Sequence, residues 1–244
     1  MSVKTDIRRK KFDIGKEDLF HIHTFRCKHA EEVTDTAYIE RALELGSNGI
    51  WFTDHAPFPG DPFGNRMSYE TLSEYLDTLS ALKEKYYRKI DIHIGLEIEY
   101  FPSFDRAGYY EELRSDERIE LLLLGQHMAE DTKGGYSFDW DKERLIAMEA
   151  DALGEAICEG IERGYFDIIA HPDRIYRRRS SWTEDMAMLA EKMITKAQLL
   201  EIPLEQNESS KLRKHQYWNE FWELNADRCK IVKGLDAHSL DEMK

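Results

Sequence analysis

Short apolar runs alternate with longer helical patterns along most of this chain of 244 residues. The apolar runs have the length and composition of buried strands. They lie at residues 19–24, 49–53, 90–100, 119–125, 166–170, 200–204 and 231–235. Helical patterns lie between several of them, at residues 34–45, 69–86, 140–163 and 183–197. Because parallel strands need long crossovers that usually contain a helix, this order predicts an α/β fold with a parallel sheet.

Capping residues give the predicted helices their ends. Asp35, Ser68 and Asp139 are the expected N-caps, and Gly46 and Gly164 are the expected C-terminal stops. Continued this far, the strand–helix order suits a (β/α) barrel. A doubly wound open sheet is the alternative, but such sheets usually carry a glycine-rich phosphate loop. Neither GxGxxG nor GxxxxGKS/T occurs in the chain.

Length and charge limit the class of protein. A chain of this length is expected to form one domain, residues 1–244. Its 48 acidic and 34 basic residues give a formal net charge of −14. This charge disfavours a nucleic-acid partner, because nucleic-acid-binding surfaces gather positive charge. The hydrophobic content of 41% is enough for a sizeable core.

Membrane and secretion signals are not expected. The longest aliphatic run, residues 121–124, is far shorter than the ~20 apolar residues of a membrane-spanning helix. Residues 1–13 are basic, but no apolar stretch follows as it would in a secretory signal. The cysteines are widely spaced, odd in number and form no CxxC motif. This pattern predicts a reduced, cytoplasmic protein without a membrane partner; it indicates no particular oligomeric state.

Histidines gather where the predicted strands end. Five of the nine lie within or just past the C-terminal end of a strand: His21, His55, His127, His171 and His238. That edge is where parallel barrels place their active sites. Side chains at positions i and i+2 of a strand also point to the same face. We therefore expect convergence of polar side chains at this edge.

Strand alternation extends the group. It pairs His21 with His23 and Asp236 with His238, and it places the polar residues of 91–99, among them Glu97, on one face. Clustered imidazoles and carboxylates are ligands of divalent metals. Without a metal, several carboxylates in a dry pocket would be costly. Each short motif alone has an ordinary explanation, but their joint occurrence at strand ends predicts a metal site.

The motifs follow a recognisable order. They are His-Ile-His-Thr-Phe-Arg-Cys-Lys-His at 21–29, Phe-Thr-Asp-His-Ala-Pro-Phe-Pro at 52–59, Gly-Leu-Glu-Ile-Glu-Tyr at 95–100, Gly-Gln-His at 125–127, Ala-His-Pro-Asp at 170–173 and Gly-Leu-Asp-Ala-His at 234–238. This order resembles the polymerase and histidinol phosphatase (PHP) superfamily, and within it the histidinol-phosphatase branch. The resemblance covers nearly the whole chain.

The resemblance implies a distorted (β/α)7 TIM-like barrel with three divalent metal ions at the C-terminal ends of the strands. Carried over by motif, the first ion takes His21, His23, Glu97 and Asp236. Glu97 also binds the second ion with His127 and His171, and the third ion takes His29, His55 and His238. This ligand set suits zinc, manganese or iron, and suits magnesium less because magnesium prefers oxygen ligands. His93 and His215 are left over and are expected to be structural or on the surface.

The resemblance also implies an activity, the metal-dependent hydrolysis of a phosphate monoester. The best guess is L-histidinol phosphate, in histidine biosynthesis. Bound metals would neutralise the phosphate oxygens and lower the pKa of water towards ~7, so that hydroxide attacks phosphorus without a covalent phosphoenzyme. Asp54 and Asp173, next to ligand positions, are candidate proton donors for the leaving alcohol; alternatively, each orients a ligand imidazole.

Arginines are the expected clamps on the phosphate, because a guanidinium forks onto two oxygens. Arg174 follows the His-Pro-Asp motif, and Arg213 follows a polar segment similar to the family's substrate-facing strand. The basic run at residues 177–179 is expected to be a solvated loop, and Cys27, Cys158 and Cys229 are expected to be inert.

Other functions would use the same metals. A phosphodiesterase or exonuclease is one alternative, because the superfamily includes polymerase proofreading domains, but the charge of −14 argues against it. A phosphatase of another small phosphorylated metabolite, a phosphotyrosine-protein phosphatase and a non-catalytic metal-binding module are the others. Degenerate members usually lose ligands, whereas all nine ligand positions here hold suitable residues. A small phosphorylated substrate is therefore the expected partner.

Overall fold

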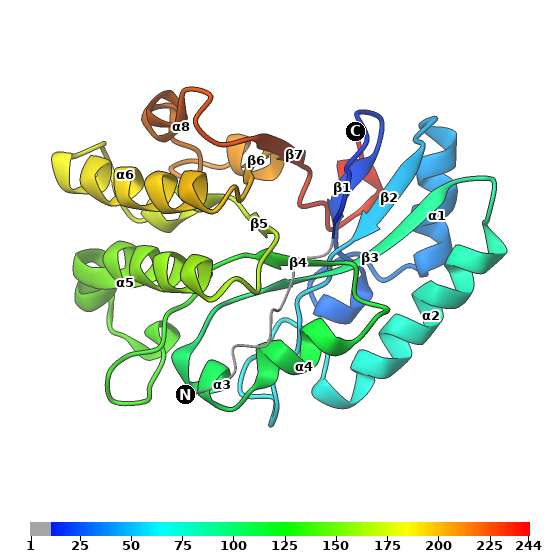
Figure 1. Cartoon of the computed structure of the whole chain (residues 1–244), viewed down its shortest axis with the longest axis horizontal. Coiled ribbons are helices and arrows are strands. Elements are labelled where there is room, and N and C mark those ends of the chain that lie inside the picture. Colours follow the sequence, from blue (N-terminus) through cyan, green and yellow to red (C-terminus); the bar gives the residue numbers. More distant parts are fainter. Residues whose placement is uncertain (1–10) are drawn as a thin grey trace. The chain divides into compact units, whose positions relative to one another are not determined.

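A computed structural model describes residues 11–244 of the chain (Figure 1). Its strands are β1 (Leu19–Ile22), β2 (Gly49–Phe52), β3 (Asp91–Ile98), β4 (Leu121–Leu124), β5 (Ile168–Ile169), β6 (Leu204–Asn207) and β7 (Ile231–Gly234). They follow one another in the sheet in chain order. The register of β1 with β2, β2 with β3 and β5 with β6 is parallel, which confirms the expected α/β fold.

Helices lie between most of these strands. They are α1 (Asp35–Glu44), α2 (Leu72–Lys85), α3 (Pro102–Arg106), α4 (Tyr109–Ser115), α5 (Lys142–Arg163), α6 (Glu184–Leu199), α7 (Glu208–Lys211) and α8 (Asn219–Asn225). Short 3-10 turns add η1 (Phe25–Cys27), η2 (Tyr69–Thr71), η3 (Ser137–Asp139), η4 (Pro172–Tyr176) and η5 (Leu240–Glu242). Within the described residues, no helix is both long and apolar enough to cross a bilayer.

One strand prediction needs correction. The strand expected at residues 200–204 is wrong: α6 runs to Leu199, the chain turns at Glu201 with a φ of 51°, and β6 begins only at Leu204. Apolar residues 199 and 200 belong to the end of the helix, and both are exposed. Most of the basic segment at residues 1–13, which we expect not to be a secretory signal, lies outside the described residues.

The expected caps are shifted by one or two positions. Thr34 precedes α1 where Asp35 was expected, and Asp141, not Asp139, caps α5 by accepting from the Arg144 N–H. Ser68 precedes the 3-10 turn η2 rather than α2, and its side chain does not cap that turn. The two glycines do mark helix ends, because Gly164 is the C-cap of α5 and Gly46 follows that of α1. Polar residues cluster before α1 and α5, and this makes the capping position ambiguous by a residue or two.

The chain forms two compact units, which we describe separately. The β1–β3 unit contains described residues 11–98, 116–123 and 233–244. Its core forms where Ile50 pairs with Ile92 and Phe52 with Ile94, all of them buried. Helices α1 and α2 accompany these strands in Figure 1. Apolar residues on both faces of β2 explain its continuous hydrophobic run, as is usual for covered parallel strands.

The α5–α6 unit contains residues 99–115 and 124–232. Helices α5 and α6 run next to each other (Figure 1). Their approach depends on Gly154, because a Cβ at this position would lie 2.7 Å from the Leu189 Cδ2 atom. Ile169 of β5 pairs with Leu204 of β6 in the same unit. This packing fixes the loops that follow β5 and β6, where several predicted site residues lie.

Candidate metal centre

Main-chain pairing brings four segments of the β1–β3 unit together. Ala237 pairs with Ile22 in a parallel bridge, so the residues on either side of Ala237 lie beside those on either side of Ile22. The same kind of bridge joins His55 to Glu97. Segments distant in sequence therefore deliver their polar side chains to the ends of β1, β2 and β3.

Two buried carboxylates lie at the centre of this group. Glu97 Oε2 is 3.4 Å from the Nε2 atoms of both His21 and His23, and 3.1 Å from His55 Nδ1. Asp236 Oδ1 is 3.3 Å from His23 Nε2. These distances are compatible with side chains that share cations. The unit brings together seven of the nine predicted ligands, here called the histidine–carboxylate cluster: His21, His23, His29, His55, Glu97, Asp236 and His238.

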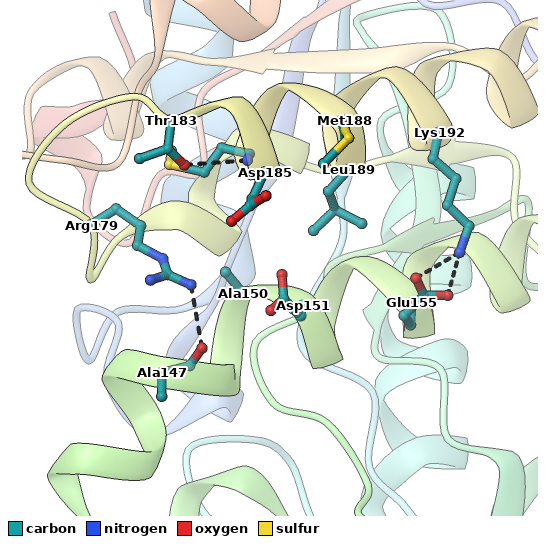
Figure 2. Close-up of a pocket in the computed structure, with 11 residues that line it drawn as sticks. Ala147, Ala150, Asp151, Glu155, Arg179, Thr183, Asp185, Met188, Leu189 and Lys192 are labelled. Carbon is teal, nitrogen blue, oxygen red and sulfur yellow. Dashed lines mark hydrogen bonds and ion pairs between the residues drawn. The ribbon is translucent and has the colours of Figure 1, made fainter.

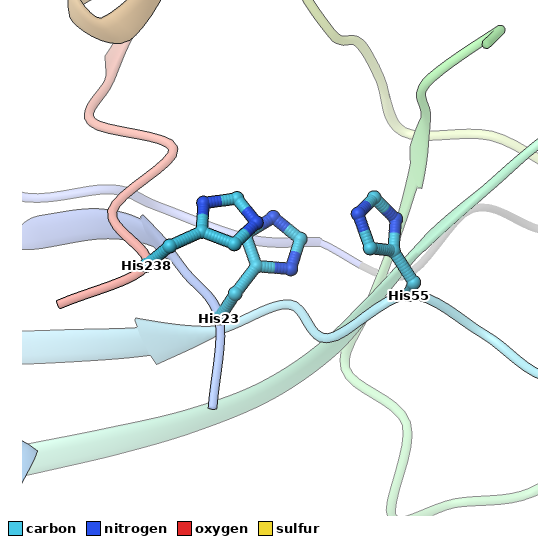
Figure 3. A group of neighbouring side chains, drawn as sticks. All are labelled: His23, His55 and His238. Atoms are coloured by element: carbon cyan, nitrogen blue, oxygen red, sulfur yellow. The ribbon is translucent and has the colours of Figure 1, made fainter. Parts of the chain in front are cut away.

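Three imidazoles of the cluster face one another in Figure 3. The ring of His23 lies 4.5 Å from that of His55 and 4.3 Å from that of His238, between centroids. The ring of His29, which is exposed, lies 4.6 Å from that of His238. Ligand atoms of His23, His55 and His238 all lie within 4.8 Å of one another, so one ion could contact all three.

The backbone at the cluster departs from regular strand geometry. His21 has a φ of 71° and Asp236 a φ of 55°, both in the left-handed region that non-glycine residues rarely adopt. The register of β1 with β2 is irregular over the same stretch. Such conformations cost about 1–3 kcal/mol each and concentrate at functional sites. The alternation argument therefore predicts the correct neighbours, but the side chains converge through local strain.

The polar atoms of the cluster suit a divalent cation. His23 Nδ1 and His238 Nε2 are buried and make no hydrogen bond to any residue in 11–244. Burial opposes a charge on His23, but Asp236 and Glu97 outweigh it and raise the pKa of His23 to about 9. Burial and the nearby His23 lower the pKa of His238 to about 3. In the metal-free chain a proton on His23 thus partly offsets the two carboxylates.

Metal affinity is expected to rise with pH up to about 9, because a cation must displace the His23 proton. Because folding raises the pKa of His23, its proton stabilises the metal-free fold fully below about pH 6.5. This contribution to stability is lost as the pH passes about 9. Chelator competition with zinc at several pH values measures the slope. His93→Asn, outside the cluster, should keep it; affinity independent of pH would contradict the expectation.

Asp54 lies buried beside the cluster. Its carboxylate accepts from the Thr24 N–H at 2.8 Å and from the Thr24 hydroxyl at 3.1 and 3.0 Å. Burial raises the pKa of Asp54 to about 6, although His23 and the bonds from Thr24 oppose the shift. Cys27 is also close, and burial raises the pKa of its thiol to about 12, in line with the inert role expected for it.

The other two predicted ligands come together in the α5–α6 unit. The rings of His127 and His171 lie 5.1 Å apart. His127 Nδ1 is 3.3 Å from Glu99 Oε1, and Glu99 is buried. His171 has a φ of 30°, and its main-chain N–H donates to Glu205 Oε2 at 3.1 Å. A carboxylate against the ring of a ligand histidine, as Glu99 lies against His127, is usual at metal sites. Glu205 instead holds the main chain of His171.

Glu205→Ala is expected to lower metal content and kcat by about 10–100-fold, because the strained main chain of His171 loses its acceptor. Glu205→Gln should stay close to the parent, since its amide oxygen can still accept that N–H. Metal analysis and kinetics measure the effect, and circular dichroism reports the fold. Equal losses in both variants, with metal content unchanged, would contradict a positioning role for Glu205.

The predicted phosphate clamps have different surroundings. Arg174 is buried and donates to Ser210 Oγ at 3.0 and 2.8 Å and to Asn207 Oδ1 at 3.2 Å. Arg213 is exposed just after α7. The structure holds the first guanidinium in place and leaves the second in solvent.

Asp173 anchors the start of α8. Its Oδ2 accepts from the main-chain N–H of Trp218 at 2.8 Å and from the indole N–H of Trp222 at 3.0 Å. Burial raises the pKa of Asp173 to about 7, although these bonds oppose the shift.

The two histidines outside the predicted ligand set, His93 and His215, both stack on tryptophans. The ring centroids lie 3.9 Å apart for His93 with Trp51 and 6.0 Å apart for His215 with Trp218.

Three supporting residues lie outside the predicted set of ligands, proton donors and phosphate clamps, although two of them, Thr24 and Glu99, stand inside the motifs at 21–29 and 95–100. They are Thr24, which holds Asp54, Glu99, which contacts His127, and Glu205, which holds His171. Glu99 and Glu205 do lie in predicted strands or beside one, at positions where an acid would be buried. A buried acid next to a ligand motif is the signal that could have identified them.

Comparison with known proteins places the chain in a family. A profile of the PHP domain matches residues 20–205. A curated protein of Deinococcus radiodurans, named as a probable histidinol-phosphatase, is 31% identical over 163 residues, which cover 63% of this chain and 59% of that protein. The chain thus spans less than two thirds of that relative's length.

Two solved structures share the fold. One, provisionally described as histidinol phosphatase HisK of Listeria monocytogenes, is 17% identical with a TM-score of 0.76, over 93% of this chain and 97% of that one. The other, histidinol phosphate phosphatase of Lactococcus lactis with zinc, L-histidinol and phosphate, is 18% identical with a TM-score of 0.70, over 92% and 87%. The likeness confirms the expected TIM-like (β/α)7 class of fold. Since the PHP profile also covers most of its length, the chain belongs to the PHP domain family.

Proposed function

We propose that this protein is a metal-dependent phosphomonoesterase that hydrolyses L-histidinol phosphate to L-histidinol and phosphate. The observation that carries the proposal is the histidine–carboxylate cluster, in which Glu97 lies within 3.4 Å of three imidazoles. The Deinococcus relative and the zinc-containing Lactococcus structure support the substrate class by their names. On this proposal the chain is a single domain, residues 1–244, of a cytoplasmic enzyme of histidine biosynthesis.

We assign the cluster to the binding of divalent metal ions, zinc, manganese or iron, in line with its imidazole content. His21, His23, Glu97 and Asp236 would hold one ion, and His29, His55 and His238 another. His127 and His171, in the α5–α6 unit, are proposed as ligands of a third on the family resemblance alone. Bound there, such ions would neutralise phosphate oxygens and make water acidic enough to ionise near neutral pH.

The residues of the chain set up the site before any substrate arrives. Glu97 and Asp236 supply negative charge in a buried position and so favour a cation over a neutral occupant. Arg174, held by Ser210 and Asn207, is the proposed phosphate clamp, because its fork is already oriented. Arg213 is the weaker proposal, since solvent exposure lessens the value of its charge.

Asp54 is the proposed proton donor for the leaving alcohol, and Asp173 is the second candidate. Asp54→Asn is expected to lower kcat for histidinol phosphate by about 10²-fold and to remove the fall of kcat at alkaline pH. The parent enzyme should lose activity at alkaline pH because a proton donor works only while it is protonated, and the pKa of Asp54 is about 6 in the metal-free chain. The loss should be much smaller with p-nitrophenyl phosphate, whose leaving group needs no proton.

Asp173→Asn is the comparison for this test. If Asp173 only anchors α8, its variant loses stability and keeps the alkaline limb of the pH profile. An Asp54→Asn enzyme that keeps the limb and loses equally on both substrates would contradict the donor role. It would then favour an orienting role for Asp54.

A direct assay tests the proposed function. The metal-loaded protein is compared on histidinol phosphate, p-nitrophenyl phosphate, bis-p-nitrophenyl phosphate and single-stranded DNA. The proposal predicts a higher kcat/KM for histidinol phosphate than for the bis-ester, and no DNA cleavage. Faster turnover of the bis-ester or DNA would favour a phosphodiesterase or exonuclease. No turnover of any substrate would favour a binding module.

A further inference from the structure

A hollow lies between α5 and α6, within the α5–α6 unit, and the proposed activity does not use it. Its volume is about 590 Å³, within the range of small-molecule sites. Figure 2 shows the side chains that line it from both helices and from the segment before α6. One wall is apolar, formed by Ala147, Ala150, Leu189 and the methionines 186 and 188.

Part of the charge at and near this hollow is already neutralised. Lys192 contacts both oxygens of Glu155, at 2.6 and 2.5 Å. Arg177 and Arg178 both bind Glu149, at 2.8 and 2.7 Å. The basic run at 177–179, expected to be a solvated loop, is therefore largely held against α5 by ion pairs. Of these three arginines, Arg179 lines the hollow.

Three charged groups of the hollow remain without an ion pair to any of residues 11–244: Arg179, Asp151 and Asp185. The Arg179 guanidinium makes one long bond, to the Ala147 carbonyl at 3.4 Å, which leaves most of its five donors for another acceptor. Figure 2 shows this guanidinium and the two carboxylates pointing into the same space. This arrangement of charge is complementary to a ligand that carries both an anionic and a cationic group.

The position of these groups is fixed by the packing of the two helices. Leu189 sits against Gly154, where a Cβ would lie 2.7 Å from Leu189 Cδ2, so α5 and α6 cannot slide freely past each other. Thr183 caps α6 by accepting from the Met186 N–H and so fixes the first turn, which carries Asp185. The receptor is therefore largely preorganised, which lowers the cost of binding.

We propose that this hollow binds a zwitterionic α-amino acid with an aliphatic side chain. Arg179 would take the carboxylate in a forked pair. Asp151 and Asp185 would accept from the ammonium group, which has three donors. Leu189 and Met188 would cover the side chain, and Met188, now 60% exposed, would become buried. The proposal stands apart from the phosphatase activity, because no residue of the hollow belongs to the candidate metal centre.

Methionine methyl NMR of the metal-loaded protein tests the proposal without any activity assay. The chain has 8 methionines, and Met188→Leu identifies the signal of Met188 in a protein labelled with ¹³C at the methionine methyls. L-Leucine is the probe, with isoamylamine and 4-methylpentanoate as analogues that lack one charge each. A saturable shift of the Met188 signal is expected, with L-leucine binding at least about 10-fold more tightly than either analogue, as for loss of one charged hydrogen-bonded contact.

Paired variants decide the outcome. Arg179→Gln and Asp151→Asn should each weaken L-leucine binding about 10-fold or more. The double variant Lys192→Met with Glu155→Gln removes the neutralised pair of the same hollow and should leave binding nearly unchanged. The spectra of the free variants report whether each one is folded. No methyl shift with L-leucine, equal affinity for the three probes, or equal losses in the control would overturn the proposal.

Discussion

Replacing Glu97 by glutamine is expected to lower kcat for phosphate monoesters by at least about 10³-fold. Glu97 Oε2 lies within 3.4 Å of three imidazole nitrogens, so this one carboxylate contacts three predicted ligands. Glutamine keeps the shape but removes the charge that a divalent ion needs. Metal analysis of the purified variant should show fewer ions per chain than in the parent.

Glu120→Gln is the matched control for this variant. Glu120 belongs to the same unit and also contacts an imidazole, with His93 Nδ1 at 3.0 Å, and it contacts Lys83 as well. It lies outside the cluster, so its loss should affect stability more than catalysis. A Glu97→Gln protein with full metal content and activity, or a Glu120→Gln protein equally inactive, would contradict the assigned role of Glu97.

Metal removal is expected to lower the melting temperature by about 8–16 °C. At free metal about 1,000-fold above Kd, binding to the native state alone contributes about 4.1 kcal/mol, and each kcal/mol moves Tm by about 2–4 °C at this chain length. The physical reason is that the cluster buries the carboxylates of Glu97 and Asp236, whose charge the proton on His23 offsets only in part, so a bound cation adds stability. Calorimetry before and after dialysis against a chelator measures the shift.

Variants of the cluster separate this effect from general damage by the chelator. Glu97→Gln should start at a lower Tm and show a smaller further loss on chelation. Re-addition of zinc should restore the parent and restore the variant less. An unchanged Tm of the parent after complete metal removal would contradict the view that cations stabilise the cluster.

The fold could be predicted from the sequence because each element has a strong local pattern. Buried aliphatic runs such as 121–124 and long amphipathic segments such as 142–163 leave little choice of secondary structure. The prediction of a strand at 200–204 is wrong because residues 199 and 200 finish a helix, and three of the four residues of the strand Leu204–Asn207 are polar. Polar strands that carry functional residues lose the apolar signal on which such predictions depend.

Only part of the candidate site can be predicted from the sequence. Motifs around His21, His55 and His171 reveal candidate ligands, since these residue types recur at strand ends. The backbone strain at His21 and Asp236 has only a weak sequence signal, because Asp and His tolerate a positive φ better than most non-glycine residues but do not require it. Supporting contacts, such as that of Glu205 with the His171 N–H, join segments more than thirty residues apart and depend on the folded chain.

The cluster's role in binding metal is tested most directly by diffraction from crystals of the active protein at the absorption edge of its bound metal. Anomalous peaks are predicted next to His21, His23, Glu97 and Asp236, at metal–ligand distances of about 2.0–2.3 Å. An active crystal without any anomalous peak among these side chains would contradict the assignment.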